Sequence, residues 1–176
     1  MTTCNQIGQK GSLCIRPMGV DDLAEVFHIG EIIFTAEYSP SLYRTWDEYE
    51  VISMFNSDSE LCLVAESGGR IVGFALGTTV EKHHSAWKYG YLVWLGVCPQ
   101  AQKLRVGQSL FKEMKRRMLA QGVRMIIIDT DAENRAGIDF FTKLGFGNSQ
   151  EHVYMTLNLD RKAKKKRKKK DAGDDS

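Results

Sequence analysis

The sequence predicts an α/β domain in which helices flank one mixed β-sheet, and two patterns indicate this class. The apolar segments 60–65 and 70–78 flank a Gly-Gly pair, which is typical of a hairpin in an antiparallel meander. Farther along, the uncharged segment 89–97 and the apolar segment 125–129 are separated by a helical pattern, which is typical of a parallel β-α-β unit. The continuous apolar run 125–129 predicts a strand in a sheet that is covered on both faces. A meander that leads into such units gives a mixed sheet.

The first half of the chain predicts one strand and two helices ahead of the hairpin. Residues 12–16 are a short strand, and Asp21 or Asp22 can cap the helix that follows. Pro40 interrupts the helical pattern, so a second helix is expected over 46–55. Both helices therefore fall between the first strand and the meander.

The second half of the chain predicts two helices that alternate with strands. Gly107 opens a helix that runs to Gln121, and another helix covers 135–144. The alternating segment 152–159 is the expected last strand. The predicted order of elements is β-αα-βββ-α-β-α-β.

Charge divides the 176-residue chain into a mildly acidic body and a basic end. Hydrophobic residues make up 43%, enough for one core, so a single domain is expected over 12–160. The formal net charge is +2, but residues 161–176 hold nine Lys or Arg and three Asp, and the rest of the chain is net −4. We expect 161–176 to be disordered by like-charge repulsion and the polar residues 1–11 to be flexible. The basic end could bind a polyanion such as RNA or a ribosome, or it could only keep the chain soluble.

The four cysteines predict free thiols rather than disulfides or a metal site. No Cys-x-x-Cys motif occurs, and Cys14, Cys62 and Cys98 lie in apolar segments, where a thiol is usually buried. The chain shows no signal-peptide pattern and no apolar run long enough to cross a membrane. These features favour a cytoplasmic protein that binds no metal.

The segment 89–110 carries the main chemical signal. A buried strand leads through a turn at Cys98-Pro99 into a loop with Lys103 and Arg105, and then into a helix. The first turn of a helix presents unpaired N–H groups and a positive dipole end. A strand, loop and helix of this kind can therefore hold a phosphate group.

Two motifs, in this order, resemble those of the GNAT superfamily of N-acetyltransferases. The loop Gln102-Lys103-Leu104-Arg105-Val106-Gly107 is similar to the acetyl-CoA pyrophosphate loop, [Q/R]-x-x-G-x-[G/A], with Arg105 in place of the first glycine. Farther on, Asn134, Phe140, Gly145 and Phe146 match the segment N-x-x-A-x-x-[F/L]-Y-x-x-x-G-F, in which Gly137 replaces Ala and Phe141 replaces Tyr. The resemblance covers residues 12–159. It implies a GNAT-like fold and transfer of acetyl from acetyl-CoA to a primary amine.

The resemblance also implies where acetyl-CoA binds. The pantetheine arm would lie in a gap where the strands ending near 97 and 129 part, and a backbone N–H of the first strand would stabilise charge on the thioester oxygen. Asn134 would hydrogen-bond that arm, although Asn is equally a favoured helix N-cap. The implied cofactor-binding residues are Leu95, Gly96, Val97, Gln102, Lys103, Leu104, Arg105, Val106, Gly107, Gln108, Asn134 and Phe141.

The groups that the resemblance implies for proton transfer are altered in this chain. The superfamily often has a glutamate base eleven residues before the loop motif, where this chain has Tyr91. Tyr91 could pass a proton through water, orient the amine, or simply pack. Asp129 follows the second strand and could accept a proton from the amine, or it could be a solvated loop acid. Phe141 replaces the tyrosine that protonates the departing thiolate in many relatives, and it cannot donate a proton. We therefore take Tyr91 and Asp129 as the candidate catalytic residues.

Acidic and aromatic residues near the implied acceptor site could bind an amine. Glu37 and Tyr38 lie between the first two helices, Tyr89 shares a strand face with Tyr91, and Asp131 follows the second strand. Ordinary capping and packing would explain the same residues. The acceptor could be a protein N-terminus, a lysine or a small amine, and transfer would be direct, in a ternary complex. The alternative is a non-catalytic acyl-CoA-binding module that the basic end holds on nucleic acid or a ribosome.

Overall fold

Strands and helices follow the predicted order as far as residue 143. The computed structural model describes residues 12–35, 45–81 and 87–151, and the single positions 153, 155 and 157. Its main elements are β1 (Cys14–Pro17), α1 (Leu23–Ile33), α2 (Glu48–Asp58), β2 (Cys62–Ser67), β3 (Arg70–Glu81), β4 (Lys88–Val97), α3 (Val106–Ala120), β5 (Val123–Ile127) and α4 (Arg135–Lys143). Short 3-10 turns lie at Val20–Asp22, Ser59–Leu61 and Pro99–Ala101.

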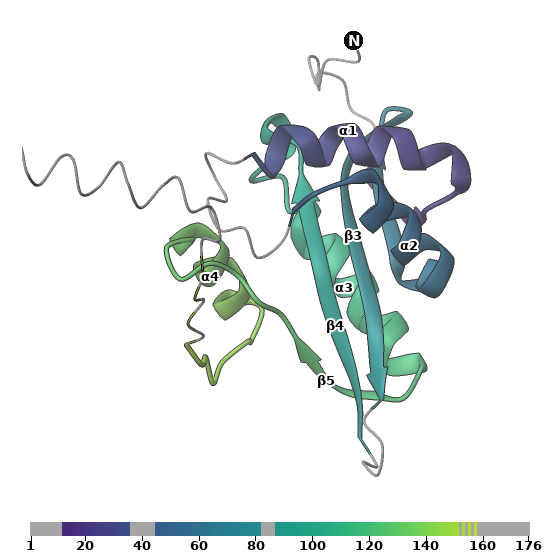
Figure 1. Ribbon diagram of the computed structural model, residues 1–176. Coiled ribbons are helices and arrows are strands. Elements are labelled where there is room, and N and C mark those ends of the chain that lie inside the picture. The colour runs from purple at the N-terminus through teal and green to yellow at the C-terminus, as the bar shows by residue number, and fades with distance from the viewer. Residues whose placement is uncertain are drawn as a thin grey trace, which may run out of the picture.

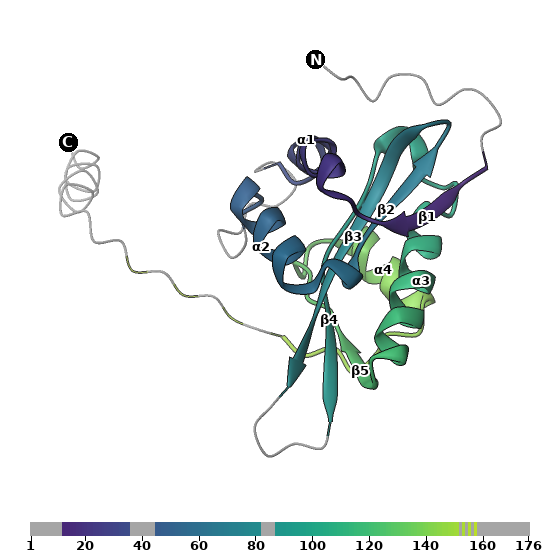
Figure 2. The same cartoon turned by 90° about the vertical axis from the view of Figure 1, so that its right-hand side faces the viewer.

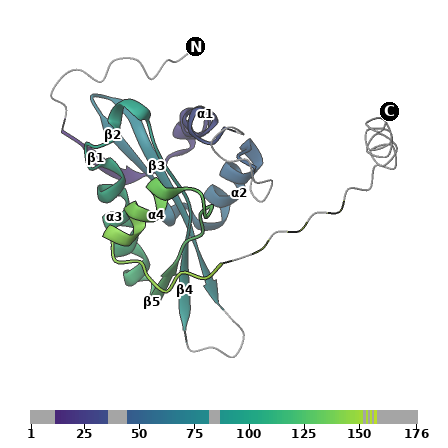
Figure 3. The same cartoon turned by 90° about the vertical axis from the view of Figure 1, so that its left-hand side faces the viewer.

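The five strands form one sheet in the order in which they occur along the chain (Figure 1). Neighbouring strands from β1 to β4 are antiparallel, and β5 pairs in parallel with β4. Helices α1 and α2 lie on one face of the sheet, and α3 and α4 lie on the other (Figures 2 and 3). This mixed sheet flanked by helices confirms the predicted fold class.

Local signals explain where several elements begin and turn. The Asp47 carboxylate caps α2 by accepting the Glu50 N–H at 2.8 Å. Gly68 and Gly69 have φ angles of +59° and +73°, which allow the predicted hairpin turn between β2 and β3. Asp22 precedes α1, but its carboxylate accepts hydrogen bonds from the Gly19 N–H and from Arg16 instead of from α1.

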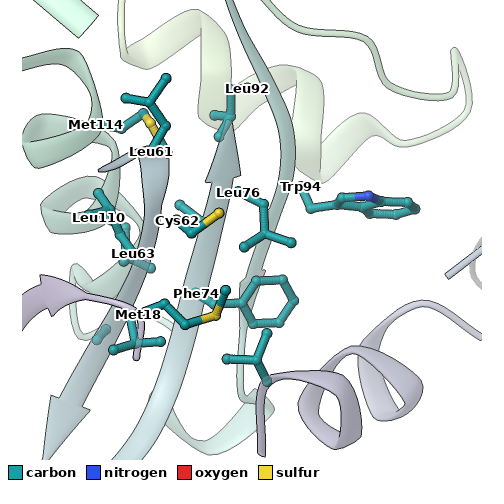
Figure 4. Close-up of a cluster of buried hydrophobic side chains, with 14 of the residues drawn as sticks. Met18, Leu61, Cys62, Leu63, Phe74, Leu76, Leu92, Trp94, Leu110 and Met114 are labelled. Carbon is teal, nitrogen blue, oxygen red and sulfur yellow. The ribbon is translucent and has the colours of Figure 1, made fainter. Parts of the chain in front are cut away.

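The core occupies both faces of the central strands. Figure 4 shows Leu110 and Met114 on one side of these strands, and Phe74 and Trp94 on the other. On the α3 face, Gly77 lets the helix approach closely, since a Cβ there would lie only 2.9 Å from Met118 Cε. On the opposite face lies an aromatic cluster whose ring centroids are 4.7–6.2 Å apart, formed by Phe34, Trp46, Phe74 and Trp94.

A β-bulge in β4 changes the face that each side chain takes. Leu76 of β3 lies opposite Trp94 and Gly77 lies opposite Leu92, so Val93 is the extra residue. Before the bulge, Gly90 faces Met118 of α3, which places Tyr89 and Tyr91 on the α1/α2 face. After the bulge, Trp94 joins the aromatic cluster on that same face. Tyr91 and Trp94 therefore share a face although they are three residues apart.

Helix α3 is tied to the start of β2 by charged groups. Glu113 accepts hydrogen bonds from Arg116 and Arg117 at 2.7–2.8 Å, and these lower the pKa of its carboxyl to about 2. Arg117 also donates through Nη1 to the Glu60 carbonyl at 3.1 Å. At the other end of the sheet, hydrogen bonds from Arg16 lower the pKa of Asp22.

Two predictions about burial are corrected. Cys14 is exposed, not buried, because it lies at the start of the edge strand β1. Cys62 and Cys98 are buried free thiols, as predicted, and burial raises the pKa of Cys62 to about 12. In β5 only Val123 is fully buried, and Met125 and Ile127 are 47% and 45% exposed. Met125 and Ile127 lie opposite Tyr89 and Tyr91 and share their face, whereas α3 packs on the other face of β5, so this apolar run is not covered on both faces.

The strand predicted for 152–159 is not found at the positions that the structure describes there. Val153, Met155 and Leu157 carry no strand assignment and are 83–90% exposed. An alternating pattern makes a strand only where a neighbouring strand takes up its hydrogen bonds, and no such pairing is present at these three positions. Among the described residues, no helix has the length and apolar character needed to cross a bilayer.

Candidate active site

Strands β4 and β5 part halfway along β4. Their pairing runs from Lys88 opposite Val123 to Tyr91 opposite Ile127, where β5 ends. β4 continues to Val97, so its edge over 92–97 has no partner strand among the described residues. Figure 1 shows the chain leaving β5 and turning away from β4 toward α4. The free edge includes Leu95, Gly96 and Val97 and offers backbone N–H and C=O groups to a ligand.

Tyr91 and Asp129 meet at the point where the two strands part. The Tyr91 hydroxyl donates to Asp129 Oδ1 at 2.5 Å, a distance typical of a hydrogen bond to a charged oxygen. Tyr91 is half-buried on β4, and Asp129 is exposed two residues beyond β5. Two candidates that are 38 residues apart in sequence thus form one hydrogen-bonded pair. A phenolic oxygen that donates its proton can also accept hydrogen bonds through its lone pairs.

The other candidate acceptor residues differ in their placement. Tyr89 is half-buried and shares the face of Tyr91. Asp131 forms the turn before α4: its Oδ1 accepts the Glu133 N–H at 2.8 Å, so the carboxylate has a local structural role. Glu37 and Tyr38 lie outside the described residues.

The loop between β4 and α3 leaves backbone N–H groups for a ligand. α3 begins at Val106, and no side chain caps it, whereas Asp47 and Asn134 cap α2 and α4. The first N–H bonded back along the chain is that of Ser109, to the Arg105 carbonyl at 3.0 Å. The N–H groups of Val106, Gly107 and Gln108 therefore have no partner within the helix. No acidic residue lies in this first turn.

The exposed loop residues 102–105 add positive charge and a left-handed backbone. Lys103 and Arg105 have φ angles of +66° and +62°. Arg105 thus holds a conformation that glycine adopts freely, and this is how the chain keeps the loop turn without the glycine of the family motif. Gly107 cannot be enlarged as easily, because a Cβ there would lie 3.2 Å from Phe140 Cζ of α4. Unpaired N–H groups and two cations suit a phosphate-bearing ligand such as CoA.

Asn134 and Phe141 have structural contacts that account for them. Asn134 caps α4 by accepting the Gly137 N–H at 3.0 Å, and its Nδ2 donates to Thr130 Oγ1 at 2.9 Å. Gly137 fits here because a Cβ would lie 2.5 Å from Asn134 Nδ2. Phe141 is half-buried beside Phe140 and Phe146, at centroid separations of 5.1 and 5.4 Å. Its ring has no proton to donate.

Sequence reasoning missed one contact on the same face of β4. Trp94 Nε1 donates to Glu50 Oε1 of α2 at 3.3 Å. The two residues are 44 positions apart, and the bulge at Val93 sets the face of Trp94, so no local pattern could have paired them. In the described ranges, no three His, Cys, Asp or Glu side chains gather as a metal site would require.

Comparison with known proteins identifies the class to which this fold and site belong. Residues 24–146 match the Acetyltransferase (GNAT) family. An acetyltransferase of Yersinia enterocolitica is 30% identical over 131 residues, which are 73% of this chain and 87% of that protein. The chain therefore belongs to the GNAT family of N-acetyltransferases.

Further likenesses agree with the family. The mycothiol acetyltransferase of Sanguibacter keddieii is 32% identical over 104 residues, or 58% of this chain, but these span only 33% of that protein. An aminoglycoside N-acetyltransferase in complex with CoA superposes with a TM-score of 0.64 at 16% identity, covering 88% of this chain and all of that one. The NatC complex bound to Gag peptide and CoA gives 0.63 at 18% identity, covering 78% of this chain and 86% of that one. These structures share the fold.

Proposed function

We propose that this protein transfers the acetyl group of acetyl-CoA directly to a primary amine, which the Tyr91–Asp129 pair receives and deprotonates. The observation that carries the proposal is the 2.5 Å hydrogen bond between these side chains where β4 and β5 part. Here an exposed carboxylate lies beside the part of β4 that has no partner strand on this edge among the described residues. Family membership does not favour the alternative of a non-catalytic binding module.

Acetyl-CoA would supply the activated acetyl group as a thioester. The N–H groups at the start of α3, together with Lys103 and Arg105, would hold its pyrophosphate. The free edge of β4 at 95–97 would hold the pantetheine arm. Two solved structures of this fold contain CoA, which supports this assignment.

Tyr91 and Asp129 would move one proton. Because the Tyr91 proton is already directed at Asp129, the phenolic oxygen can accept a hydrogen bond from an incoming ammonium group. The ammonium proton passes to the Tyr91 oxygen as the Tyr91 proton passes to Asp129. Asp129 is exposed, so it can release that proton to water. The amine is thereby left with a free electron pair at the gap.

The side chain at position 141 would take no part in proton transfer. Phe141 packs between aromatic neighbours and has no donor. A thiol has an ordinary pKa of about 8.5, so the CoA sulfur can leave without an acid from the protein and take its proton from solvent.

The acceptor is a primary amine of a protein N-terminus, a lysine or a small molecule. The solved structures that share this fold include an aminoglycoside acetyltransferase and a complex with a bound peptide, which supports acceptors of different size.

We further propose that residues 161–176, with nine Lys or Arg, bind a polyanion. The 176-residue chain and its residues 1–160 alone should then differ in RNA affinity, with the difference shrinking as salt rises; equal affinity would contradict the proposal.

Calorimetric titration with acetyl-CoA, CoA and dephospho-CoA tests the cofactor site. We expect micromolar binding of acetyl-CoA, weakened about tenfold or more by Arg105→Glu, because the new charge faces the pyrophosphate. Arg124→Glu, which makes the same charge change at an exposed position on β5, serves as the control. No binding of acetyl-CoA to folded protein would contradict the proposal.

A further inference from the structure

Two aromatic side chains on the α1/α2 face of β4 each bind a carboxylate. Tyr91 donates to Asp129, and Trp94 donates through Nε1 to Glu50 Oε1. The two aromatic residues lie on either side of the bulge at Val93. One carboxylate comes from the segment beyond β5 and the other comes from α2.

Glu50 is held in place but keeps the capacity to bind a cation. Trp94 is only 9% exposed, and it directs its single donor at a half-buried Glu50. A carboxylate can accept about four hydrogen bonds, and a neutral indole uses one of them. Within the described residues, no Lys or Arg forms an ion pair with Glu50. A partly buried carboxylate without a cation favours binding of a positively charged group.

We infer that Glu50 is a specificity-determining residue that binds a second positive charge on the acceptor. The inference rests on the proposed function, which places the reacting amine at Tyr91. Tyr91 lies opposite Thr78 and Trp94 lies opposite Leu76, two positions apart on β3, so the bulge brings the two side chains to about 7 Å along the sheet. An acceptor that spans this distance and carries a cation at each end, such as a diamine or polyamine, would meet Asp129 at one end and Glu50 at the other.

A Glu50→Gln variant separates charge recognition from a purely structural role. The amide oxygen of glutamine still accepts the Trp94 N–H, so the contact between α2 and β4 is kept while the negative charge is removed. Glu48→Gln is the matched control, because it removes the same charge from an exposed position in the first turn of the same helix. Putrescine and aminobutanol are suitable acceptors, since they have the same length and differ in one terminal charge.

We expect that removing the Glu50 charge weakens the use of putrescine much more than that of aminobutanol. Glu50→Gln raises KM for putrescine about five- to tenfold and changes KM for aminobutanol less than twofold, while Glu48→Gln changes neither by more than twofold. Thermal melting of Glu50→Gln should match that of the wild type. Equal KM values for putrescine in the wild type and Glu50→Gln, or an equal rise for both amines, would overturn the inference while the proposed function stands.

Binding without turnover distinguishes the two proposals. In calorimetric titrations without acetyl-CoA, putrescine should bind the wild type more tightly than Glu50→Gln. If that difference is found but neither amine is acetylated by the wild type, the proposed function fails and the charge site remains. If both amines are acetylated and putrescine binds the two proteins equally, the charge site fails alone.

Discussion

Replacing Tyr91 with Phe removes one hydroxyl group and leaves the ring, so it isolates the proton path. The lost hydrogen bond joins a neutral donor to a carboxylate at 2.5 Å, and bonds of this kind contribute about 1.5–3 kcal/mol, or roughly 10- to 150-fold in rate if the bond is needed in the transition state. General acid–base catalysis contributes about 10²–10⁴-fold. We therefore expect kcat/KM for the amine to fall about 100-fold, with KM for acetyl-CoA within threefold of the wild type.

The pH dependence of the fall in kcat/KM of Tyr91→Phe shows whether Tyr91 helps to deprotonate the amine or only orients it. A lysine-like amine has a pKa of about 10.4, so at pH 7 only about one molecule in 2,500 carries a free electron pair. If Tyr91 relays a proton, the deficit of Tyr91→Phe shrinks as pH rises from 7 toward 10, because the amine then arrives deprotonated. A deficit that stays constant over this range indicates that Tyr91 only orients the amine.

Initial rates of amine acetylation across pH provide the assay, with Tyr49→Phe as a control at a 76% exposed position on α2. The Tyr91→Phe, Asp129→Asn double variant should be no slower than the slower single variant, because both changes interrupt one path. Wild-type kcat/KM in Tyr91→Phe, or fully additive losses in the double variant, would refute the reasoning.

Three further predictions concern stability. Arg105→Gly should raise the free energy of unfolding by up to about 1 kcal/mol and Tm by about 2–4 °C. The reason is that relief of the left-handed backbone strain, about 1–2 kcal/mol, exceeds the cost of the added backbone freedom of glycine, about 0.5–1 kcal/mol. An unchanged or lower Tm would contradict this prediction. Gly30→Ala should lower the free energy of unfolding, measured in urea, by about 2–3 kcal/mol, because its Cβ would lie 2.0 Å from Trp46. Gly19→Ala is the control: its Cβ would meet nothing closer than 3.5 Å, so the loss should be less than about 1 kcal/mol. Similar losses of stability in the two variants would be evidence against the packing of Gly30 on Trp46. Glu113 has a pKa of about 2, below its ordinary 4.5, so its stabilising effect is present above pH 4.5 and is lost as pH falls toward 2. The difference in Tm between the wild type and Glu113→Gln should therefore shrink over that range of pH. A difference in Tm that does not depend on pH would contradict this role of Glu113.

Elements with local signals could be predicted from the sequence. The hairpin at Gly68 and Gly69, the apolar strand 89–97 and the helix after Arg105 rest on turn chemistry and periodicity, and the structure contains all three. Local patterns failed for 153, 155 and 157, because whether an alternating segment forms a strand depends on a neighbouring strand elsewhere in the chain. They also failed for Cys14, since the apolar context of a residue does not reveal that its strand lies at the edge of the sheet.

The candidate site could be predicted only in part. The family motifs pointed to Tyr91 and Asp129 separately, one through its place before the loop and the other through its place after a strand. Their direct hydrogen bond depends on how β4 and β5 pair and then part. The contact between Trp94 and Glu50 depends on the bulge at Val93, which shifts the alternation of β4 by one residue and leaves no trace in the sequence pattern.

Product analysis with acetyl-CoA and a panel of primary amines tests the central claim most directly. CoA thiol release and N-acetylated amine are measured together in one reaction. The account predicts one N-acetyl product for each thiol released, and loss of both signals in parallel in Tyr91→Phe at neutral pH. Thiol release without acetylated amine, or no release with any amine while acetyl-CoA binds, would contradict it.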